Sequence, residues 1–366
     1  MDAELFSADS HVLEPYDLWS NALGDRFGEQ TPRLVTERHG EQGRFFFTGN
    51  QFWKLARYEE EAASAGAPQA GFVPEERIKF QHGAGVAAEM MNPTVMLPIM
   101  NASNQPENRE MVKAAAEVYN DWIYDFCAYD LPRLVPVAAI PVDDIDWAVR
   151  EVDRNAKRGF RSIMIHARYP EGCPPYRDPH YDPLWARCEE MDLPLTLHII
   201  TGRIPDPLFA YEEADQQEGP NAMLDTYEEI PHTIANEFIY GKIFDRFPKL
   251  RLLTGELELS WIPHFMMRLD MMQGVFSDRL SLPTLEMKAS DYVRTRVWHG
   301  LIDDKFGLGG LDLIGESQVC WGSDFPHSIA IGSEAQEAVE KILGDLQPDT
   351  RRRLACDNAK TLFSLH

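Results

Sequence analysis

The sequence lacks a surplus of positive charge. It has 35 Lys and Arg residues against 59 Asp and Glu residues, which gives a formal net charge of −24. A protein that binds nucleic acid needs basic residues to neutralise phosphates, so this composition argues against nucleic acid as a partner. An anionic substrate would need a local cationic clamp or a bound metal ion.

Long apolar runs and paired cysteines are also missing. No apolar stretch approaches the roughly 18 residues that a membrane span requires, and the N-terminus lacks the basic and apolar pattern of a signal peptide. The five cysteines are spread along the chain without a C-x-x-C spacing. We therefore expect reduced thiols in a cytoplasmic protein, with no membrane partner and no cysteine metal site.

The chain does have enough apolar residues for a large core, because 44% of its 366 residues are hydrophobic. Short apolar runs predict eight strands, at residues 5–8, 94–97, 134–140, 162–165, 195–197, 250–253, 296–298 and 319–321. Helical spacing predicts helices at residues 108–129, 145–156, 183–191, 230–247 and 333–346. Eight alternating strands and helices favour an α/β fold, a distorted (β/α)8 TIM barrel that takes up residues 1–366 as a single domain.

Two segments interrupt this alternation. Residues 12–90 are too long for one connection and are expected to form an insertion or cap. They include a predicted hairpin over residues 33–55, with turns at Gly40–Gly43 and Gly49–Asn50. Residues 199–228, rich in Pro, Asp and Glu, are expected to form a long loop over the active site, since loops of this length are usually functional.

Polar residues follow six of the predicted strands. In barrels of this kind, catalytic groups gather at the carboxyl ends of the strands. The residues are Asp9 and His11 after the first strand, His166 and Arg168 after the fourth, His198 after the fifth, Glu256 after the sixth, His299 after the seventh, and Asp324 with His327 after the eighth.

Each of these residues alone has an ordinary explanation as a helix cap or a packed histidine. The stretch "SADSHVLEP", with Asp9, His11 and Glu14, fits a helix start as well as a metal site. Six strands that end in His, Asp or Glu are harder to explain by capping. Carboxylates gathered in one small volume repel one another, and a bound divalent metal would offset that repulsion.

Five segments carry a resemblance to a known family. They are "ADSHVLEPYDLW", "YNDWIYDFCAYDLPRLVPVAAIPVDD", "YDPLWARCEEMDLPLTLHI", "FDRFPKLRLLTGELELSWIPHFMMRLD" and "WGSDFPH". In this order they resemble the amidohydrolase superfamily, in the branch that includes aminocarboxymuconate-semialdehyde decarboxylase and the γ-resorcylate and 5-carboxyvanillate decarboxylases. The resemblance covers nearly the whole chain and implies a distorted TIM barrel with a metal at its mouth.

The resemblance implies four metal ligands, which are Asp9, His11, His198 and Asp324. Two imidazoles and two carboxylates suit Zn, Mn or Fe. We expect one ion per chain, with two as the alternative. Many relatives have His-x-His or Glu-x-His on the first strand, whereas this chain has Asp9-Ser10-His11, and the added negative charge favours the harder ions.

A second departure concerns the sixth strand, where the decarboxylases place a catalytic histidine. The matching residue here is Glu256, with Glu258 as a weaker alternative. Glu256 is expected either to shuttle protons or to bind a second metal. Glu14, His299 and His327 are candidates for a second metal or for contacts that orient the ligands, although Glu14 fits a first helical turn equally well.

The expected activity is non-oxidative decarboxylation or hydrolysis of a small aromatic carboxylic acid, with Asp324 and Glu256 as the proton-transfer residues. His166 and Arg168 are expected to bind the substrate carboxylate. The alternative is a dinuclear non-heme iron or mixed-metal oxygenase on the same fold, which two ions per chain would favour. A non-catalytic scaffold is a third hypothesis.

The remaining expectations are less specific. His232 fits either a pocket or packing. The resemblance implies a homo-oligomer, such as a dimer, or pairing with a related subunit, because relatives often pair through such insertions. The other histidines are expected to be structural or exposed, namely His39, His82, His180, His264 and His366.

Overall fold

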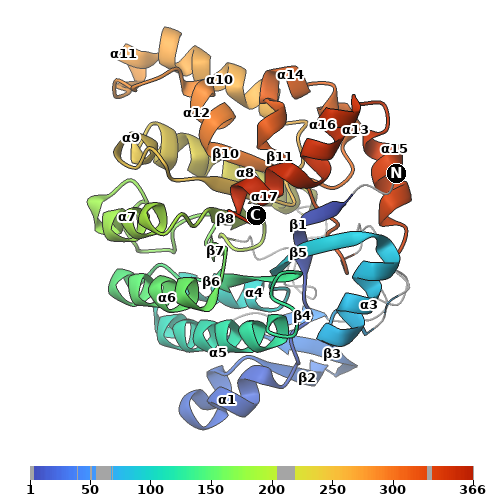
Figure 1. The fold of residues 1–366 in the computed structure, drawn as a ribbon. Helices are drawn as coiled ribbons and strands as arrows, with labels where there is room; N and C mark the ends of the chain where they lie inside the picture. The colour runs from blue at the N-terminus through green and yellow to red at the C-terminus, as the bar shows by residue number, and fades with distance from the viewer. Residues whose placement is uncertain are drawn as a thin grey trace.

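The computed structural model describes residues 4–38, 40–49, 52–54, 67, 69–203, 219–327 and 332–365. Eight parallel strands curl into a nearly closed barrel, and helices surround it (Figure 1). The strands, in their order around the barrel, are β1 (Leu5–His11), β5 (Val86–Asn92), β6 (Leu134–Ala139), β7 (Ser162–Ile165), β8 (Leu195–His198), β9 (Leu252–Gly255), β10 (Val297–Leu301) and β11 (Val319–Trp321). The predicted barrel is confirmed.

Helices follow the strands along the chain and cover the barrel. They are α1 (Leu18–Phe27), α3 (Pro74–Ala84), α4 (Met96–Asn101), α5 (Arg109–Cys127), α6 (Ile145–Arg158), α7 (Asp182–Glu190), α8 (Gly219–Thr233), α9 (Ile243–Arg246), α10 (Ile262–Val275), α11 (Ser277–Leu280), α12 (Ala289–Arg296), α13 (Lys305–Leu308), α14 (Leu311–Ile314), α15 (Ala335–Leu343), α16 (Pro348–Arg352) and α17 (Asn358–Leu362). None of the helices in the described ranges combines the length and the apolar composition that crossing a membrane requires.

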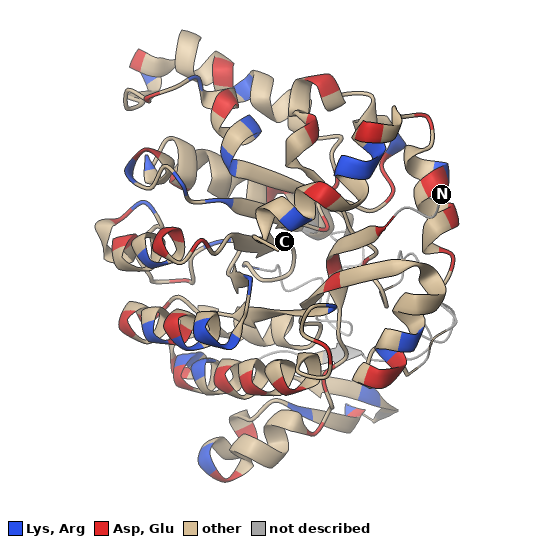
Figure 2. Cartoon of the chain, viewed as in Figure 1, with Lys and Arg blue, Asp and Glu red and all other residues tan. Residues whose placement is uncertain are grey.

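Local sequence explains where these helices lie. The face of α5 that carries apolar residues at helical spacing, from Val112 to Phe126, is buried. Helix α6 begins where the Asp144 carboxylate accepts the N–H of Trp147 at 3.0 Å, and it ends at Gly159, whose φ of 99° favours glycine. Charged residues are concentrated on the outer helices, whereas most of the barrel strands contain none (Figure 2).

The second strand was predicted wrongly. Residues 94–97 do not form a strand, because helix α4 begins at Met96, and the strand is β5, eight residues earlier in the chain. A short buried apolar run does not distinguish helix from strand, and this run lies in a fully buried helix. In β5 the charged Glu89 and the polar Asn92 interrupt the apolar residues, so the strand was not recognised from the sequence. The insertion after β1 therefore ends at residue 85 rather than 90.

The insertion contains a three-stranded antiparallel sheet, β2 (Arg33–Arg38), β3 (Glu41–Phe47) and β4 (Phe52–Lys54). The predicted hairpin is confirmed, but its first turn is tighter than expected, since Glu41 already pairs with Arg38. His39 and Asn50 lie outside the described residues, as does much of the stretch from 55 to 68.

The expected long loop at 199–228 is shorter than predicted. Residues 204–218 lie outside the described residues, and helix α8 begins at Gly219 rather than near residue 230. The predicted single helix at 230–247 is interrupted as well. A π-helix, Ile234–Ile239, follows the proline of α8, and Lys242 with a φ of 62° separates it from α9.

The barrel closes between β1 and β11 by hydrogen bonds outside a regular ladder. The N–H of Asp324 donates to the Asp9 carbonyl at 2.8 Å, and the N–H of His11 donates to the Phe325 carbonyl at 2.7 Å. Gly322 permits this approach, because a Cβ there would lie 2.7 Å from the Asp9 Cβ. The seam thus brings the residues that follow β11 directly against those of β1.

Candidate metal centre

Asp9 and His11 lie within β1, which continues past the predicted end at Ala8. Both side chains are buried. The Nδ1 of His11 lies 2.7 Å from the Pro93 carbonyl, so this nitrogen carries the proton and donates it. The Nε2 lone pair of His11 therefore faces the barrel mouth, which is the state that a metal-binding imidazole requires.

His198 ends β8 and has the same arrangement. Its Nδ1 lies 2.9 Å from the Ile199 carbonyl, and its Nε2 lies 3.8 Å from Asp9 Oδ1. Gly255 at the end of β9 makes room for this ring, since a Cβ there would lie 2.5 Å from His198 Cδ2. The position of His198 thus depends on the absence of a side chain on the neighbouring strand.

Asp324 completes the predicted ligand set from the segment after β11. Its φ of 52° is uncommon for a residue with a side chain, and such strain often occurs at functional sites. Its Oδ1 lies 3.5 Å from His11 Nε2, the same distance that separates His11 Nε2 from Asp9 Oδ1. Atoms bound about 2.0–2.2 Å from one ion are separated by similar distances.

Glu256 lies inside the same cluster, immediately after β9. Its Oε1 is 3.2 Å from His11 Nε2, 3.3 Å from His198 Nε2 and 3.3 Å from His327 Nδ1. Its backbone N–H donates to Asp9 Oδ2 at 3.2 Å. Burial alone would raise the pKa of Glu256, but the surrounding imidazoles lower it well below its usual value.

His327 joins the cluster from the turn after Asp324. Its Nδ1 lies 3.2 Å from Asp324 Oδ1, its Nε2 lies 3.1 Å from Thr94 Oγ1, and its ring stacks on that of His11 with centroids 4.0 Å apart. Burial opposes protonation, yet the Asp324 and Glu256 carboxylates raise the pKa of His327 well above its usual value.

The donor set fits a divalent metal ion. His11 Nε2, His198 Nε2 and Asp324 Oδ1 are buried atoms without a hydrogen-bond partner in the described part of the chain. Imidazole lone pairs that face carboxylate oxygens repel them unless a cation lies between. In two groups of residues, the possible ligand atoms all lie within 4.8 Å of one another. One group is Asp9, His11 and His198, and the other is His11, Glu256, Asp324 and His327.

Burial and the neighbouring carboxylates also shift the pKa values of the side chains in this cluster. Burial and the Glu256 carboxylate raise the pKa of Asp324 to about 7. Burial alone would lower the pKa of His198, but Glu256 and Asp9 raise it to about 9. The field that attracts protons to these side chains also attracts a metal cation, so protons and metal compete for the site.

Asn92 is a site residue that the sequence analysis missed. It ends β5, is buried, and donates from Nδ2 to Asp9 Oδ1 at 2.7 Å. This contact orients the Asp9 carboxylate toward His11. Only a correct assignment of β5 would have indicated Asn92, because it then stands at the carboxyl end of a barrel strand.

The family model described as "Amidohydrolase" matches residues 50–365. The chain belongs to the amidohydrolase family. This amidohydrolase is 27% identical over 203 residues to the γ-resorcylate decarboxylase of Rhizobium sp. strain MTP-10005, and the match covers 54% of this chain. It spans only 59% of the length of that curated relative.

Two solved structures share the fold of this amidohydrolase. An amidohydrolase from Mycobacterium avium subsp. paratuberculosis K-10 has a TM-score of 0.82 at 19% identity, covering 99% of this chain and 100% of that chain. A 5-carboxyvanillate decarboxylase from Novosphingobium aromaticivorans, with bound manganese, has a TM-score of 0.71 at 18% identity, covering 99% and 97%.

Other predicted site residues of this amidohydrolase lie outside the two ligand groups. Both Glu14 oxygens accept backbone N–H groups of residues 94–96, so this buried carboxylate caps the start of α4. His299 is buried beside Thr254, whose Oγ1 lies 3.3 Å from His299 Nδ1, and burial lowers the pKa of His299 to about 3.

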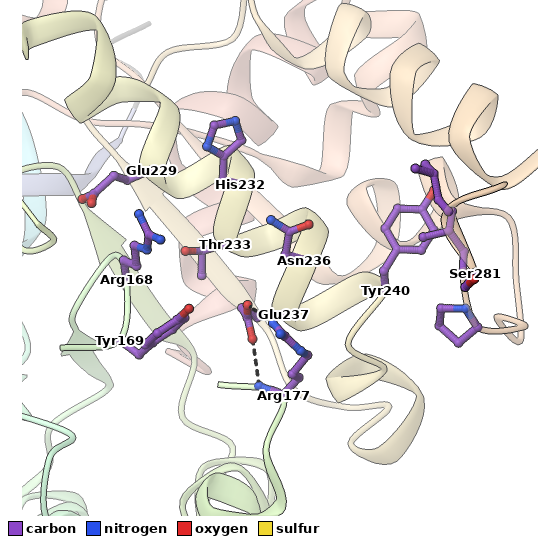
Figure 3. A pocket seen from close by; sticks show the side chains of 13 residues that line it. Arg168, Tyr169, Arg177, Glu229, His232, Thr233, Asn236, Glu237, Tyr240 and Ser281 are labelled. Carbon is purple, nitrogen blue, oxygen red and sulfur yellow. Dashed lines mark hydrogen bonds and ion pairs between the residues drawn. The ribbon is translucent and has the colours of Figure 1, made fainter. Parts of the chain in front are cut away.

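The two predicted substrate-binding residues separate in the structure. His166 is buried, its Nε2 lies 3.0 Å from the Met100 carbonyl, and burial lowers its pKa to about 4. Arg168 is exposed and lines a cavity of about 660 Å³ together with Tyr169, Glu229 and His232. Figure 3 shows this cavity beside α8, with the Arg168 guanidinium near Glu229.

No described residue that lines this cavity belongs to the ligand groups. His232 therefore lines a cavity, but a different one from the metal centre. Of the histidines expected to be structural or exposed, His82, His180 and His264 are exposed. His39 and His366 lie outside the described residues.

Proposed function

We propose that this amidohydrolase is a metal-dependent carboxy-lyase that removes CO2 from a small aromatic carboxylic acid without oxidation. The observation that carries this proposal is the buried cluster at the barrel mouth, where unpartnered donor atoms of His11, His198 and Asp324 face Asp9 and Glu256. The decarboxylase names of a curated relative and of a structural neighbour favour this chemistry over hydrolysis and over the oxygenase alternative.

Asp9, His11, His198 and Asp324 would hold the metal. A divalent ion there, with manganese suggested by the structural neighbour, supplies a positive charge for the substrate carboxylate and an adjacent oxygen. The two ligand groups share His11, whose single Nε2 lone pair binds one ion. This sharing supports one ion per chain rather than two.

Asp324 and Glu256 would divide the proton transfer between them. The Glu256 carboxylate lies among the imidazoles and stays ionised, whereas Asp324, with His327 Nδ1 3.2 Å from its Oδ1, would receive a proton from that imidazole and pass it to the substrate. In the proposed step, that proton goes to the ring carbon that bears the carboxylate. The carbon–carbon bond then breaks, its electron pair returns to the ring, and CO2 leaves.

His327 would resupply the proton. Its Nδ1 lies 3.2 Å from Asp324 Oδ1, and the two carboxylates beside it favour its protonated form. Each turnover consumes one proton from solvent, which a histidine at the edge of the cluster is placed to pass on. A glutamate instead of a histidine at the end of β9 thus leaves the acid role with Asp324.

The experiment combines elemental analysis with CO2 release under anaerobic conditions, using 2,6-dihydroxybenzoate and related hydroxybenzoates. We expect about one manganese per chain and CO2 release without oxygen. His198→Ala should lose both metal and turnover, whereas His180→Ala, an exposed histidine, should lose neither. Turnover that requires oxygen, or full turnover in His198→Ala, would refute the proposal.

A further inference from the structure

A second cavity, of about 350 Å³, opens beside Glu256 and therefore adjoins the ligand cluster. It lies between α8 and the segment that follows β9. Its volume falls within the range of ligand pockets. The described residues that line it are Tyr227, Glu228, Pro231, Glu256, Leu257, Glu258, Ser260, Trp261 and Ile302. We call it the Glu256 cavity.

Two aromatic side chains form walls of the Glu256 cavity. The Trp261 indole N–H donates to the Glu258 carbonyl at 3.0 Å, and its ring meets the edge of His299 with centroids 5.9 Å apart. Tyr227 and Pro231, both from α8, also line the cavity, and Pro231 adds an apolar surface. A flat ring that enters between such walls gains both burial and aromatic contact.

The charged side chains among the described residues that line the Glu256 cavity are all acidic. Its described lining includes Glu228, Glu256 and Glu258, and it includes no lysine, arginine or histidine. The Glu258 carboxylate is held in place, because it accepts the N–H of Ile302 at 3.2 Å and that of Asp303 at 3.1 Å. An anionic group on a ligand would therefore meet fixed negative charge, with no compensating cation among the described lining residues.

The only arginine predicted to bind substrate, Arg168, lines the other cavity and does not serve this one. α8 contributes to both, with Tyr227, Glu228 and Pro231 in the Glu256 cavity and Glu229 and His232 in the cavity of Figure 3. The cavity that adjoins the metal cluster is thus the one that lacks a cationic clamp among its described residues.

We propose that the Glu256 cavity is the subsite for the uncharged end of a substrate that carries a single carboxylate. This inference rests on the proposed function, which places the reacting carboxylate at the ligand cluster. The ring then lies between Tyr227 and Trp261, and small neutral or apolar ring substituents extend toward Leu257 and Ile302. Glu258 excludes aromatic dicarboxylates, a class to which 5-carboxyvanillate belongs.

The experiment measures dissociation constants for the manganese-loaded protein by calorimetry with three probes. They are salicylate, 5-methylsalicylate and 4-hydroxyisophthalate, which has a carboxylate where 5-methylsalicylate has its methyl group. We expect 5-methylsalicylate to bind at least as tightly as salicylate. We expect 4-hydroxyisophthalate to bind at least about tenfold more weakly, because its second carboxylate would face Glu258.

Variants separate charge from shape. Glu258→Gln should reduce the ratio of the dissociation constants of 4-hydroxyisophthalate and 5-methylsalicylate severalfold. Glu228→Gln, on α8, provides a second test if the first variant does not fold. Asp312→Asn, which removes an exposed carboxylate on α14, should leave this ratio of dissociation constants unchanged.

Equal affinity for 5-methylsalicylate and 4-hydroxyisophthalate would overturn the inference. An unchanged ratio of their dissociation constants in the glutamine variants, or no binding of any probe, would overturn it as well. A different result bears on the proposed function alone. If 5-methylsalicylate and salicylate bind but no hydroxybenzoate releases CO2, the subsite stands and the carboxy-lyase activity is wrong.

Discussion

Replacing Arg77 with methionine should destabilise the fold and weaken metal binding together, because one buried guanidinium supports both. Arg77 lies on α3 and pairs with Glu89 of β5 through contacts of 2.6 and 3.1 Å, with both side chains fully buried. Its Nη1 donates to the His11 carbonyl at 2.8 Å, and its guanidinium lies over the Phe325 ring, 4.7 Å from the centroid.

The magnitude follows from these contacts. Removing one partner of a buried ion pair leaves the other charge unpaired and costs about 3–5 kcal/mol. The free energy of unfolding of protein domains is about 5–15 kcal/mol, so Arg77→Met should lose a large share of it. Removing both charges in Arg77→Met/Glu89→Gln should cost less than the sum of the single changes, with a coupling of about 1–3 kcal/mol.

The assay is urea unfolding at pH 7 together with manganese titration of each variant. Lys79→Met is the matched control, because Lys79 lies on the same helix in an exposed ion pair with Glu76. That variant should change neither unfolding nor manganese affinity. A loss below about 1 kcal/mol in Arg77→Met, or additive single and double variants, would refute this account of the buried pair.

Three further outcomes are expected. Gly255→Ala should weaken manganese binding at least about tenfold by displacing the His198 ring. Gly274→Ala is the control and should leave manganese binding unchanged, because a Cβ there meets nothing within 4 Å. Competition with a chelator measures the manganese affinity of both variants. Asn92→Leu should weaken manganese binding by about 10–100-fold in the same assay, because Asp9 loses its orienting contact. The pKa of about 4 for His166 lies below the unfolded value of about 6.5, so the unfolded state takes up the proton first and stability falls from pH 6.5 toward pH 4. Between pH 7 and pH 5, His166→Gln should lose about 2 kcal/mol less stability than the wild-type protein in urea unfolding; an equal loss in both proteins would contradict this expectation.

The four candidate metal ligands could be predicted to lie together because each stands at or near the end of a barrel strand. Asp9, His11, His198 and Asp324 stand at the ends of apolar runs, and parallel strands in a barrel bring such ends to one rim. Alternation of strand and helix predicted only that polar residues gather at one rim, whereas the choice of these four as ligands came from the resemblance to the amidohydrolase superfamily. Their side-chain directions then follow from the closed barrel.

Glu89 and Asn92 show what the sequence could not reveal. A glutamate in the middle of β5 is tolerated only because Arg77, from the preceding helix, neutralises it, and such a pairing has no sequence period. The roles of Glu256 and Glu258 were left open for a similar reason. Both have positive φ, at 54° and 57°, so regular alternation does not tell which carboxylate faces the cluster.

The seam of the barrel connects the metal centre to the stability of the fold. β1 supplies Asp9 and His11, and the segment after β11 supplies Asp324, so candidate ligands lie on both sides of the one barrel junction that lacks a regular ladder. Arg77 braces the same junction through the His11 carbonyl and the Phe325 ring. An ion bound by these three side chains would join the two edges of the sheet. Because such binding is favourable only when the edges meet, its free energy adds to the free energy of barrel closure.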